Sequence, residues 1–206
     1  MRALKYACSL LVLMSLATSA ATIKFESGDD INEWNGTNQS NFVISKLHNQ
    51  WPYNDPQYGS WISNGDTGFQ GKYPPSDKDN PFGTFTEKFF LPDANYAGTI
   101  GVWADDTARA TLNGVVLAEP NTVLGLYCTD GPIGCLPSTG GYFSVNSSQF
   151  NPGWNYLVVE GYQLGGDAAG VRYYGALTPI PIPEPGSVAL LGLGLAGFSL
   201  LRFRRR

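Results

Sequence analysis

The hydrophobic positions of this chain come in short runs, and none of the central chain has the pattern of a long amphipathic helix. The runs are rich in β-branched and aromatic residues, and most glycines and prolines fall between them. This spacing is typical of an all-β sandwich or barrel. The runs predict strands at 22–26, 41–47, 60–63, 84–91, 98–104, 108–112, 115–118, 142–145, 154–163 and 170–177.

Two of these runs predict local detail. Asn113-Gly114 stands between apolar runs, which favours a hairpin with a type I′ turn. In the run 154–163, alternation directs Leu157 and Val159 inward and Glu160 outward. We expect Trp154, which begins that run, and Trp103 to belong to the core.

Both ends of the chain read as targeting segments. Residues 1–20 have a basic start, an apolar stretch and small residues before Ala21, which predicts a signal peptide. Residues 187–201 form an apolar run that ends in Arg202, Phe203, Arg204, Arg205 and Arg206. As a helix this run extends roughly 22 Å, which is short for the roughly 30 Å hydrocarbon core of a bilayer. The segments divide the chain into a signal peptide at 1–20, one domain at 21–178 and a sorting segment with a single transmembrane helix at 179–206.

The order Pro183-Glu184-Pro185, apolar helix and arginine cluster resembles the PEP-CTERM sorting signal of proteins exported by Gram-negative bacteria. The resemblance implies a precursor anchored in the inner membrane and an exosortase-type enzyme that processes it at or near Pro-Glu-Pro. The product then reaches the cell surface or the extracellular space. The alternative is an ordinary C-terminal membrane anchor after a proline-rich linker.

Three segments of the domain carry a second resemblance. They are Phe85 to Pro92, Trp103 to Gly114 with its Asp105-Asp106 pair, and Phe150 to Leu157. Their order is similar to the galactose-binding-like jelly roll of carbohydrate-binding modules and glycosidase accessory domains. The resemblance implies a single jelly-roll-like antiparallel β-sandwich, and a fold of this kind hosts many functions.

The net charge of the domain excludes some classes of binding partner. Between the two targeting segments lie seven basic and sixteen acidic residues, a net charge of −9. Such a surface repels nucleic acid and anionic lipid, so no nucleic-acid partner is expected.

The cysteines predict one disulfide. Cys8 belongs to the signal peptide, whereas Cys128 and Cys135 share a glycine- and proline-rich loop. In an oxidising compartment such a pair predicts a local disulfide.

The long polar segment 48–81 holds the candidate binding residues. Its aromatic residues suggest stacking platforms for sugar, at Trp51, Tyr53, Tyr58 and Trp61, although core packing competes for the same rings. Its oxygen ligands suggest a structural calcium ion at Asp77, Asp79 and Asn80, the alternative being solvated turn carboxylates.

A catalytic set does not emerge from the sequence. The chain has one histidine, and Asp105-Asp106 are neighbours that a strand would direct to opposite faces. We therefore expect a non-catalytic, exported surface or matrix protein that binds or is embedded in extracellular polysaccharide. The alternatives are a purely structural matrix protein without a ligand site and, less favoured, a glycan hydrolase.

Overall fold

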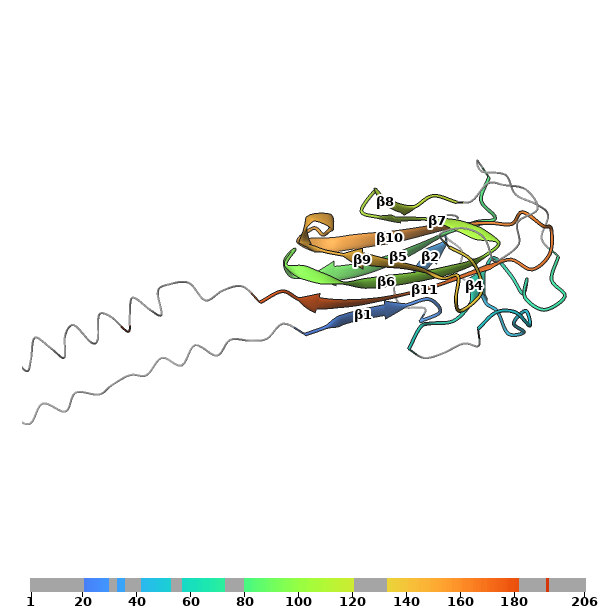
Figure 1. The fold of residues 1–206 in the computed structure, drawn as a ribbon, viewed down its shortest axis with the longest axis horizontal. Coiled ribbons are helices and arrows are strands. Elements are labelled where there is room, and N and C mark those ends of the chain that lie inside the picture. The colour runs from blue at the N-terminus through green and yellow to red at the C-terminus, as the bar shows by residue number, and fades with distance from the viewer. Residues whose placement is uncertain are drawn as a thin grey trace, which may run out of the picture.

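The computed structural model of the protein describes residues 21–29, 33–35, 42–52, 57–72, 80–120 and 133–181, together with residue 192. Strands make up nearly all of the regular structure in these parts (Figure 1). The strands are β1 (Ile23–Glu26), β2 (Glu33–Asn35), β3 (Phe42–Val43), β4 (Ile62–Ser63), β5 (Gly83–Leu91), β6 (Tyr96–Asp105), β7 (Thr107–Leu112), β8 (Val115–Ala118), β9 (Gly141–Val145), β10 (Gly153–Tyr162) and β11 (Gly170–Pro179), and a 3₁₀ turn, η1, covers Ser147–Gln149.

The strands form an all-β sandwich of two antiparallel sheets, as expected. In sheet A the order is β3-β4-β11-β6-β9, and β1 pairs with β11 beside β4. In sheet B the order is β2-β5-β10-β7-β8. From β5 to β7, and again from β9 to β11, the chain crosses between the sheets at each step, which is typical of jelly-roll sandwiches.

The core lies between the two sheets and follows the alternation of each strand. In β10, Leu157 and Val159 are fully buried while Glu160 is half-buried, which confirms their predicted directions. Trp103 is buried as expected. Trp154 is 49% exposed, so its assignment to the core was wrong. It lies an even number of residues from Glu160 on the same strand, and alternation therefore puts both on the outer face.

The predicted Asn-Gly hairpin connects β7 and β8. Asn113 and Gly114 have φ of 51° and 80°, the conformation of a type I′ turn. The Asn113 side chain also holds the hairpin to β10, because its amide nitrogen donates to Oδ1 of the fully buried Asn155 at 2.7 Å. Asn155 in turn donates to the carbonyls of Asn151 and Gly153. This amide pair satisfies polar groups that burial would otherwise leave without partners.

The observed strands differ from the predicted ones mainly in the first third of the body. Only Phe42–Val43 of the predicted strand 41–47 is a strand, and β2 was not predicted. From residue 83 onward each predicted strand is present with bounds shifted by at most a few residues. The early strands are short and lie at sheet edges or beside them, where few ladder bonds form.

β1 begins and β11 ends at the same end of the sandwich, because Ile23 pairs with Leu177 (Figure 1). Within the described ranges, no helix has the length and apolar character needed to cross a membrane. The predicted signal peptide at 1–20 lies outside the described residues. Apart from residue 192, so does the predicted helix at 187–201.

Candidate functional site

The aromatic residues predicted to stack on sugar differ in burial. Trp51 is 4% exposed and Trp61 is fully buried, and their rings stack with centroids 4.3 Å apart. A ring that stacks on a sugar needs a face open to solvent, so the prediction that these two are platforms is wrong for this arrangement. Tyr53 lies outside the described residues. Tyr58 is half-buried and contributes to the surface described next.

The outer face of sheet A brings aromatic and polar side chains together across four strands. One row of paired residues runs Glu26, Tyr174, Gly101 and Tyr142, from β1 through β11 and β6 to β9. The next row runs Lys24, Ala176, Thr99 and Ser144 across the same strands. Apart from Tyr174, the positions that β11 and β6 contribute to these two rows are small: Gly101, Ala176 and Thr99.

The Tyr174 ring lies over Gly101 on this face. A Cβ atom added to Gly101 would collide with Cδ1, Cε1 and Cζ of the Tyr174 ring, so the ring occupies the space that the glycine leaves open. Its centroid lies 5.0 Å from that of Tyr58, edge to face, and 6.0 Å from that of Trp103, nearly parallel. Partial burial raises the pKa of the Tyr174 phenol, and the nearby phenols of Tyr142 and Tyr58 raise it further.

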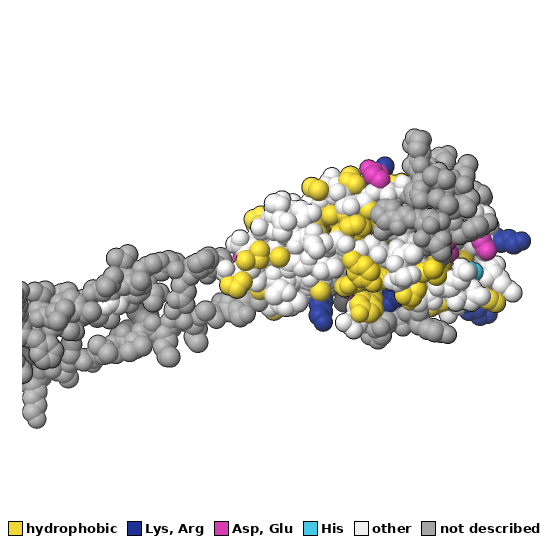
Figure 2. All heavy atoms as spheres, viewed as in Figure 1, with side chains coloured by type: hydrophobic (Ala, Val, Ile, Leu, Met, Phe, Trp, Pro, Cys, Tyr) yellow, Lys and Arg dark blue, Asp and Glu magenta, His cyan; other side chains and the backbone are white. Residues whose placement is uncertain are grey.

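Tyr142 is the most exposed of these rings, at 56%, and packs edge to face on Trp103 with centroids 5.4 Å apart. We call Tyr58, Tyr142 and Tyr174 the tyrosine face. Trp103 lies beside it on β6, paired with Arg172 of β11, and is 3% exposed. In the space-filling view, hydrophobic side chains reach the surface of the body in several separate groups (Figure 2).

Arg172 lies beside the tyrosine face, two residues before Tyr174 on the same side of β11. Its side chain is 2% exposed, and Nε donates to the Tyr58 carbonyl oxygen at 3.0 Å. The guanidinium carbon lies 5.4 Å from the centroid of Trp103 and 5.8 Å from that of Tyr58, within the range of cation–π attraction. The buried cation therefore ties the segment around Tyr58 to β11 and limits the movement of the aromatic rings beside it.

A small pocket of about 100 Å³ adjoins the tyrosine face and shares Tyr174 with it. The other residues that line it are Lys24, Phe25, Glu26, Gln57, Gly175 and Ala176. A cation, a carboxylate and an amide thus stand beside a tyrosine ring. This combination offers hydrogen-bond donors and acceptors next to a flat apolar surface, as many ligand sites do.

Asp105 and Asp106 lie away from solvent, at 6% and 5% exposure. The Asp105 carboxyl accepts from Nε1 of Trp51 at 2.7 Å, and the neighbouring Asp106 helps to raise its pKa. Alternation does not extend past Asp105, where β6 ends. Oδ2 of Asp106 also accepts from the backbone amides of Leu164 and Gly165, at 2.7 and 2.9 Å. Internal contacts therefore occupy both carboxyl groups.

The metal and disulfide predictions fall partly outside the described residues. Asp77 and Asp79 are outside them and Asn80 is inside, so the calcium site stays a prediction. Within the described part of the chain, no three His, Cys, Asp or Glu side chains are grouped to hold a metal ion. Cys135 is fully buried and disulfide-bonded, while Cys128 is outside the described residues, so their pairing also stays a prediction.

Tyr142 and Tyr174 were not among the predicted site residues. Side chains alternate between the two faces of a strand. Both neighbours of Tyr174 on β11 are buried, so Tyr174 itself points to the outer face. The sequence does not show that Gly101 lies between them, because that depends on the register of three strands.

Comparison with protein-family models identifies a motif in the C-terminal residues of the chain. Residues 181–206 match the PEP-CTERM protein-sorting motif. The predicted resemblance of Pro183, Glu184, Pro185 and the terminal arginines is thereby confirmed. The motif implies an exported protein that exosortase processes. Among curated proteins, none matches the chain significantly.

Solved structures similar to the body include carbohydrate-binding modules. A family 35 carbohydrate binding module from Clostridium thermocellum is 11% identical, with a TM-score of 0.40, over 78% of this chain and 100% of that one. Another, from an environmental isolate, is 12% identical with a TM-score of 0.39, over 78% and 99%. A Podospora anserina GH26-CBM35 β-(1,4)-mannanase is 15% identical with a TM-score of 0.37, over 79% of this chain and 29% of that one. At this similarity a binding site has to be built from the chain's own side chains.

Proposed function

We propose that this chain is a cell-surface or extracellular-matrix protein that binds extracellular polysaccharide and catalyses no reaction. The sorting motif at residues 181–206 supports export. One observation carries the binding role, the Tyr174 ring lying over Gly101 between Tyr58 and the exposed Tyr142. The tyrosine face is then the place where sugar units dock.

The chemistry of the tyrosine face suits a pyranose ring. Tyrosine presents an apolar body that packs against the C–H face of a sugar, and its hydroxyl exchanges hydrogen bonds with sugar hydroxyls. Lys24, Glu26 and Gln57 stand around the adjoining pocket and add donors and acceptors. The sheet beneath is regular, so the rings are held in place before the ligand arrives, which lowers the entropic cost of binding.

The proposal of a non-catalytic role is based on the burial and hydrogen bonding of the carboxyl groups. Asp105 and Asp106 are the adjacent pair that a hydrolase reading would use, and both are enclosed and hydrogen-bonded within the fold. Glycoside hydrolysis needs two carboxyl groups on either side of an accessible scissile bond. Among the described residues that line the pocket, Glu26 is the single carboxylate, and it stands next to Lys24.

We further propose the route by which the protein reaches its site of action. The precursor is held in the inner membrane by its C-terminal segment, and an exosortase-type enzyme recognises Pro183-Glu184-Pro185. The processed protein is released to the cell surface or matrix. A calcium ion at Asp77, Asp79 and Asn80 would be structural, bracing the segment that leads into β5, since hard oxygen ligands favour Ca²⁺.

The test compares tyrosine variants for binding to the exopolysaccharide purified from the producing bacterium. Tyr142→Ala and Tyr174→Ala should each weaken retardation in an affinity gel by about tenfold, because each removes a stacking surface. Tyr156→Ala is the matched control, being an exposed tyrosine on the outer face of the other sheet. Near-UV circular dichroism checks that each variant is folded.

A glycan array separates the polysaccharide role from its main alternative. A purely structural matrix protein would bind no glycan on the array and would show no retardation in the gel. Equal retardation of the wild type and both tyrosine variants would move the binding site elsewhere on the body. Release of sugar from the polymer during incubation would replace the proposal with a hydrolase.

A further inference from the structure

An exposed aromatic patch lies on the outer face of sheet B, on the opposite side of the sandwich from the tyrosine face. Phe90 is 51% exposed, Trp154 49% and Tyr156 42%. Phe90 pairs with Trp154 and Lys88 with Tyr156, so the four side chains occupy two neighbouring pairs on β5 and β10. We call Lys88, Phe90, Trp154 and Tyr156 the tether-end patch.

The side chains of the tether-end patch pack on one another. The rings of Phe90 and Trp154 meet edge to face with centroids 5.3 Å apart. The Lys88 ammonium lies 4.1 Å from the centroid of Trp154 and 6.0 Å from that of Tyr156. The ammonium thus lies over the Trp154 ring and adds a single positive charge to the aromatic group.

The patch lies where the chain leaves the fold. β5 ends at Leu91, a turn of four residues leads to Tyr96 at the start of β6, and Tyr96 pairs with Pro179 at the end of β11. Ile180 follows, donates its backbone amide to the Asn95 carbonyl and is 41% exposed. In Figure 2 hydrophobic side chains are seen at this end of the body.

The chain beyond β11 keeps this end close to the apolar run. Residues 180–186 separate β11 from the apolar run that starts at Ser187. Seven residues span at most about 25 Å even when fully extended. If the apolar run is inserted in a bilayer, the end of the sandwich that carries the patch stays within that distance of the lipid surface, and short tethers give a high effective concentration.

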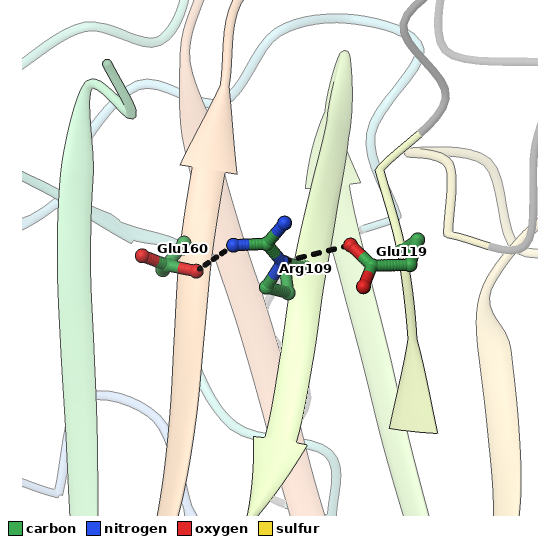
Figure 3. A network of polar contacts seen from close by, with 3 residues as sticks. All are labelled: Arg109, Glu119 and Glu160. Atoms are coloured by element: carbon green, nitrogen blue, oxygen red, sulfur yellow. Dashed lines mark hydrogen bonds and ion pairs between the residues drawn. The ribbon is translucent and has the colours of Figure 1, made fainter. Parts of the chain in front are cut away.

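The same outer face changes character toward its other end. There Arg109 of β7 bonds Glu119 at 2.8 Å and Glu160 of β10 at 3.4 Å (Figure 3). Between the two groups lie Val158 and its partner Thr86. The face therefore carries exposed aromatic rings next to the tether and an ion-paired group away from it.

We propose that the tether-end patch rests on the lipid–water interface of the inner membrane while the sorting motif still anchors the precursor. Tryptophan and tyrosine prefer this interface, where an apolar ring body meets lipid and its polar group stays hydrated. Lys88 reaches the headgroup phosphates by the same geometry. The acidic body disfavours anionic lipid, so zwitterionic lipid is the matched surface.

This inference rests on membrane insertion of the C-terminal segment and is independent of polysaccharide binding. It predicts how the precursor sits against the membrane, with sheet B turned toward the lipid and the tyrosine face of sheet A left open. The processed protein, once separated from its anchor, would lose the tether that keeps the patch at the bilayer.

The test uses the full chain reconstituted in phosphatidylcholine vesicles, with tryptophan quenching by brominated phosphatidylcholine as the readout. All five tryptophans lie between residues 34 and 154, so none belongs to the anchor. We expect quenching in the wild type and loss of most of it in Trp154→Phe. Near-equal quenching of the two, or none in the wild type, would overturn the proposal.

A second variant keeps the reporter and changes its surroundings. Phe90→Ser combined with Tyr156→Ser retains Trp154 and should reduce its quenching, whereas Tyr142→Ala on the other sheet should leave it unchanged. Unchanged quenching in the Phe90/Tyr156 variant would also count against the proposal. If the host exopolysaccharide, rather than lipid, shields Trp154 from acrylamide, the patch is a second sugar platform and the lipid assignment is wrong.

Discussion

Trp51 and Asp105 are joined by a buried hydrogen bond across 54 positions of the chain, with Nε1 of Trp51 donating to Oδ2 of Asp105 at 2.7 Å. The bond ties the irregular segment before β4 to the end of β6, and Trp51 also stacks on the fully buried Trp61. The segment singled out from the sequence as a binding loop is thus partly a second core. The buried carboxyl group of Asp105 accepts a hydrogen bond from this second core.

The pH dependence of stability should report on Asp105. Burial, above all, and the contact with Asp106 raise the pKa of the Asp105 carboxyl well above its usual value, although the Trp51 hydrogen bond lowers it somewhat. A raised folded-state pKa stabilises the fold below the unfolded pKa of about 4, and this contribution is lost as pH rises through the folded pKa. Asp105→Asn should remove that decline, because an amide does not titrate. The fold should be kept, because the amide oxygen can still accept the hydrogen bond from Trp51.

Urea unfolding between pH 3.5 and 8 measures this effect. Asp66→Asn is the control, because Asp66 is outside the buried core and bonds only an exposed hydroxyl of Ser45 among the contacts described. A free energy of unfolding that falls with pH equally in the wild type and in Asp105→Asn would assign the decline to other groups.

Trp61 should matter for stability rather than for sugar binding. Replacing this fully buried ring with alanine leaves a cavity against Trp51, and large-to-small changes of this kind cost about 3–5 kcal/mol. Trp154→Ala, at an exposed position, should cost roughly 0.5 kcal/mol or less. Denaturant midpoints of the two variants make the comparison. A Trp61→Ala protein of wild-type stability and weakened glycan affinity would restore the binding role.

Gly101→Ala tests the tyrosine face without removing any aromatic side chain. The added methyl group would collide with the Tyr174 ring and push it away from the sheet, which should weaken polysaccharide binding. Gly65→Ala is the matched control, because nothing lies within 4 Å of the position its Cβ would take. Affinity electrophoresis compares the two. Unchanged binding by a folded Gly101→Ala protein would show that the position of Tyr174 does not matter.

The predicted partner of Cys135 can be identified chemically. We expect Cys128, since closure of a loop of about eight residues should stabilise the exported protein by roughly 2–3 kcal/mol in the loop-entropy model. Mass spectrometry of non-reduced digests should find the two cysteines in one linked peptide pair. Detection of both thiols in the free form, or of Cys135 linked elsewhere, would refute the pairing.

Changing Glu184 to alanine should separate processing from membrane insertion. The apolar run stays intact, so the precursor should still insert, but an enzyme that reads Pro183-Glu184-Pro185 should no longer cut it. Immunoblots of membrane and extracellular fractions from the native host should show full-length variant retained in the membrane. Gln in place of the terminal arginines should instead weaken retention and orientation. Full-length wild-type protein persisting in the membrane would leave an ordinary anchor.

Local chemistry made several features of this protein readable from its sequence. The Asn113-Gly114 turn depends on residues that accept positive φ, and the inward direction of Leu157 and Val159 depends on two-residue alternation. The sorting motif at 181–206 is a linear pattern of consecutive residues. None of these requires knowledge of which strands become neighbours.

The positions of the aromatic residues were decided by the tertiary structure. Trp51 and Trp61 are buried because distant segments, including Asp105, enclose them, while Tyr174 becomes a surface ring because β6 brings Gly101 beneath it. Trp154 is exposed because sheet B leaves its outer face uncovered there. Burial of a large ring depends on which segments pack over it, and strand register depends on pairings across the whole sheet, so neither is encoded in any local stretch of the chain.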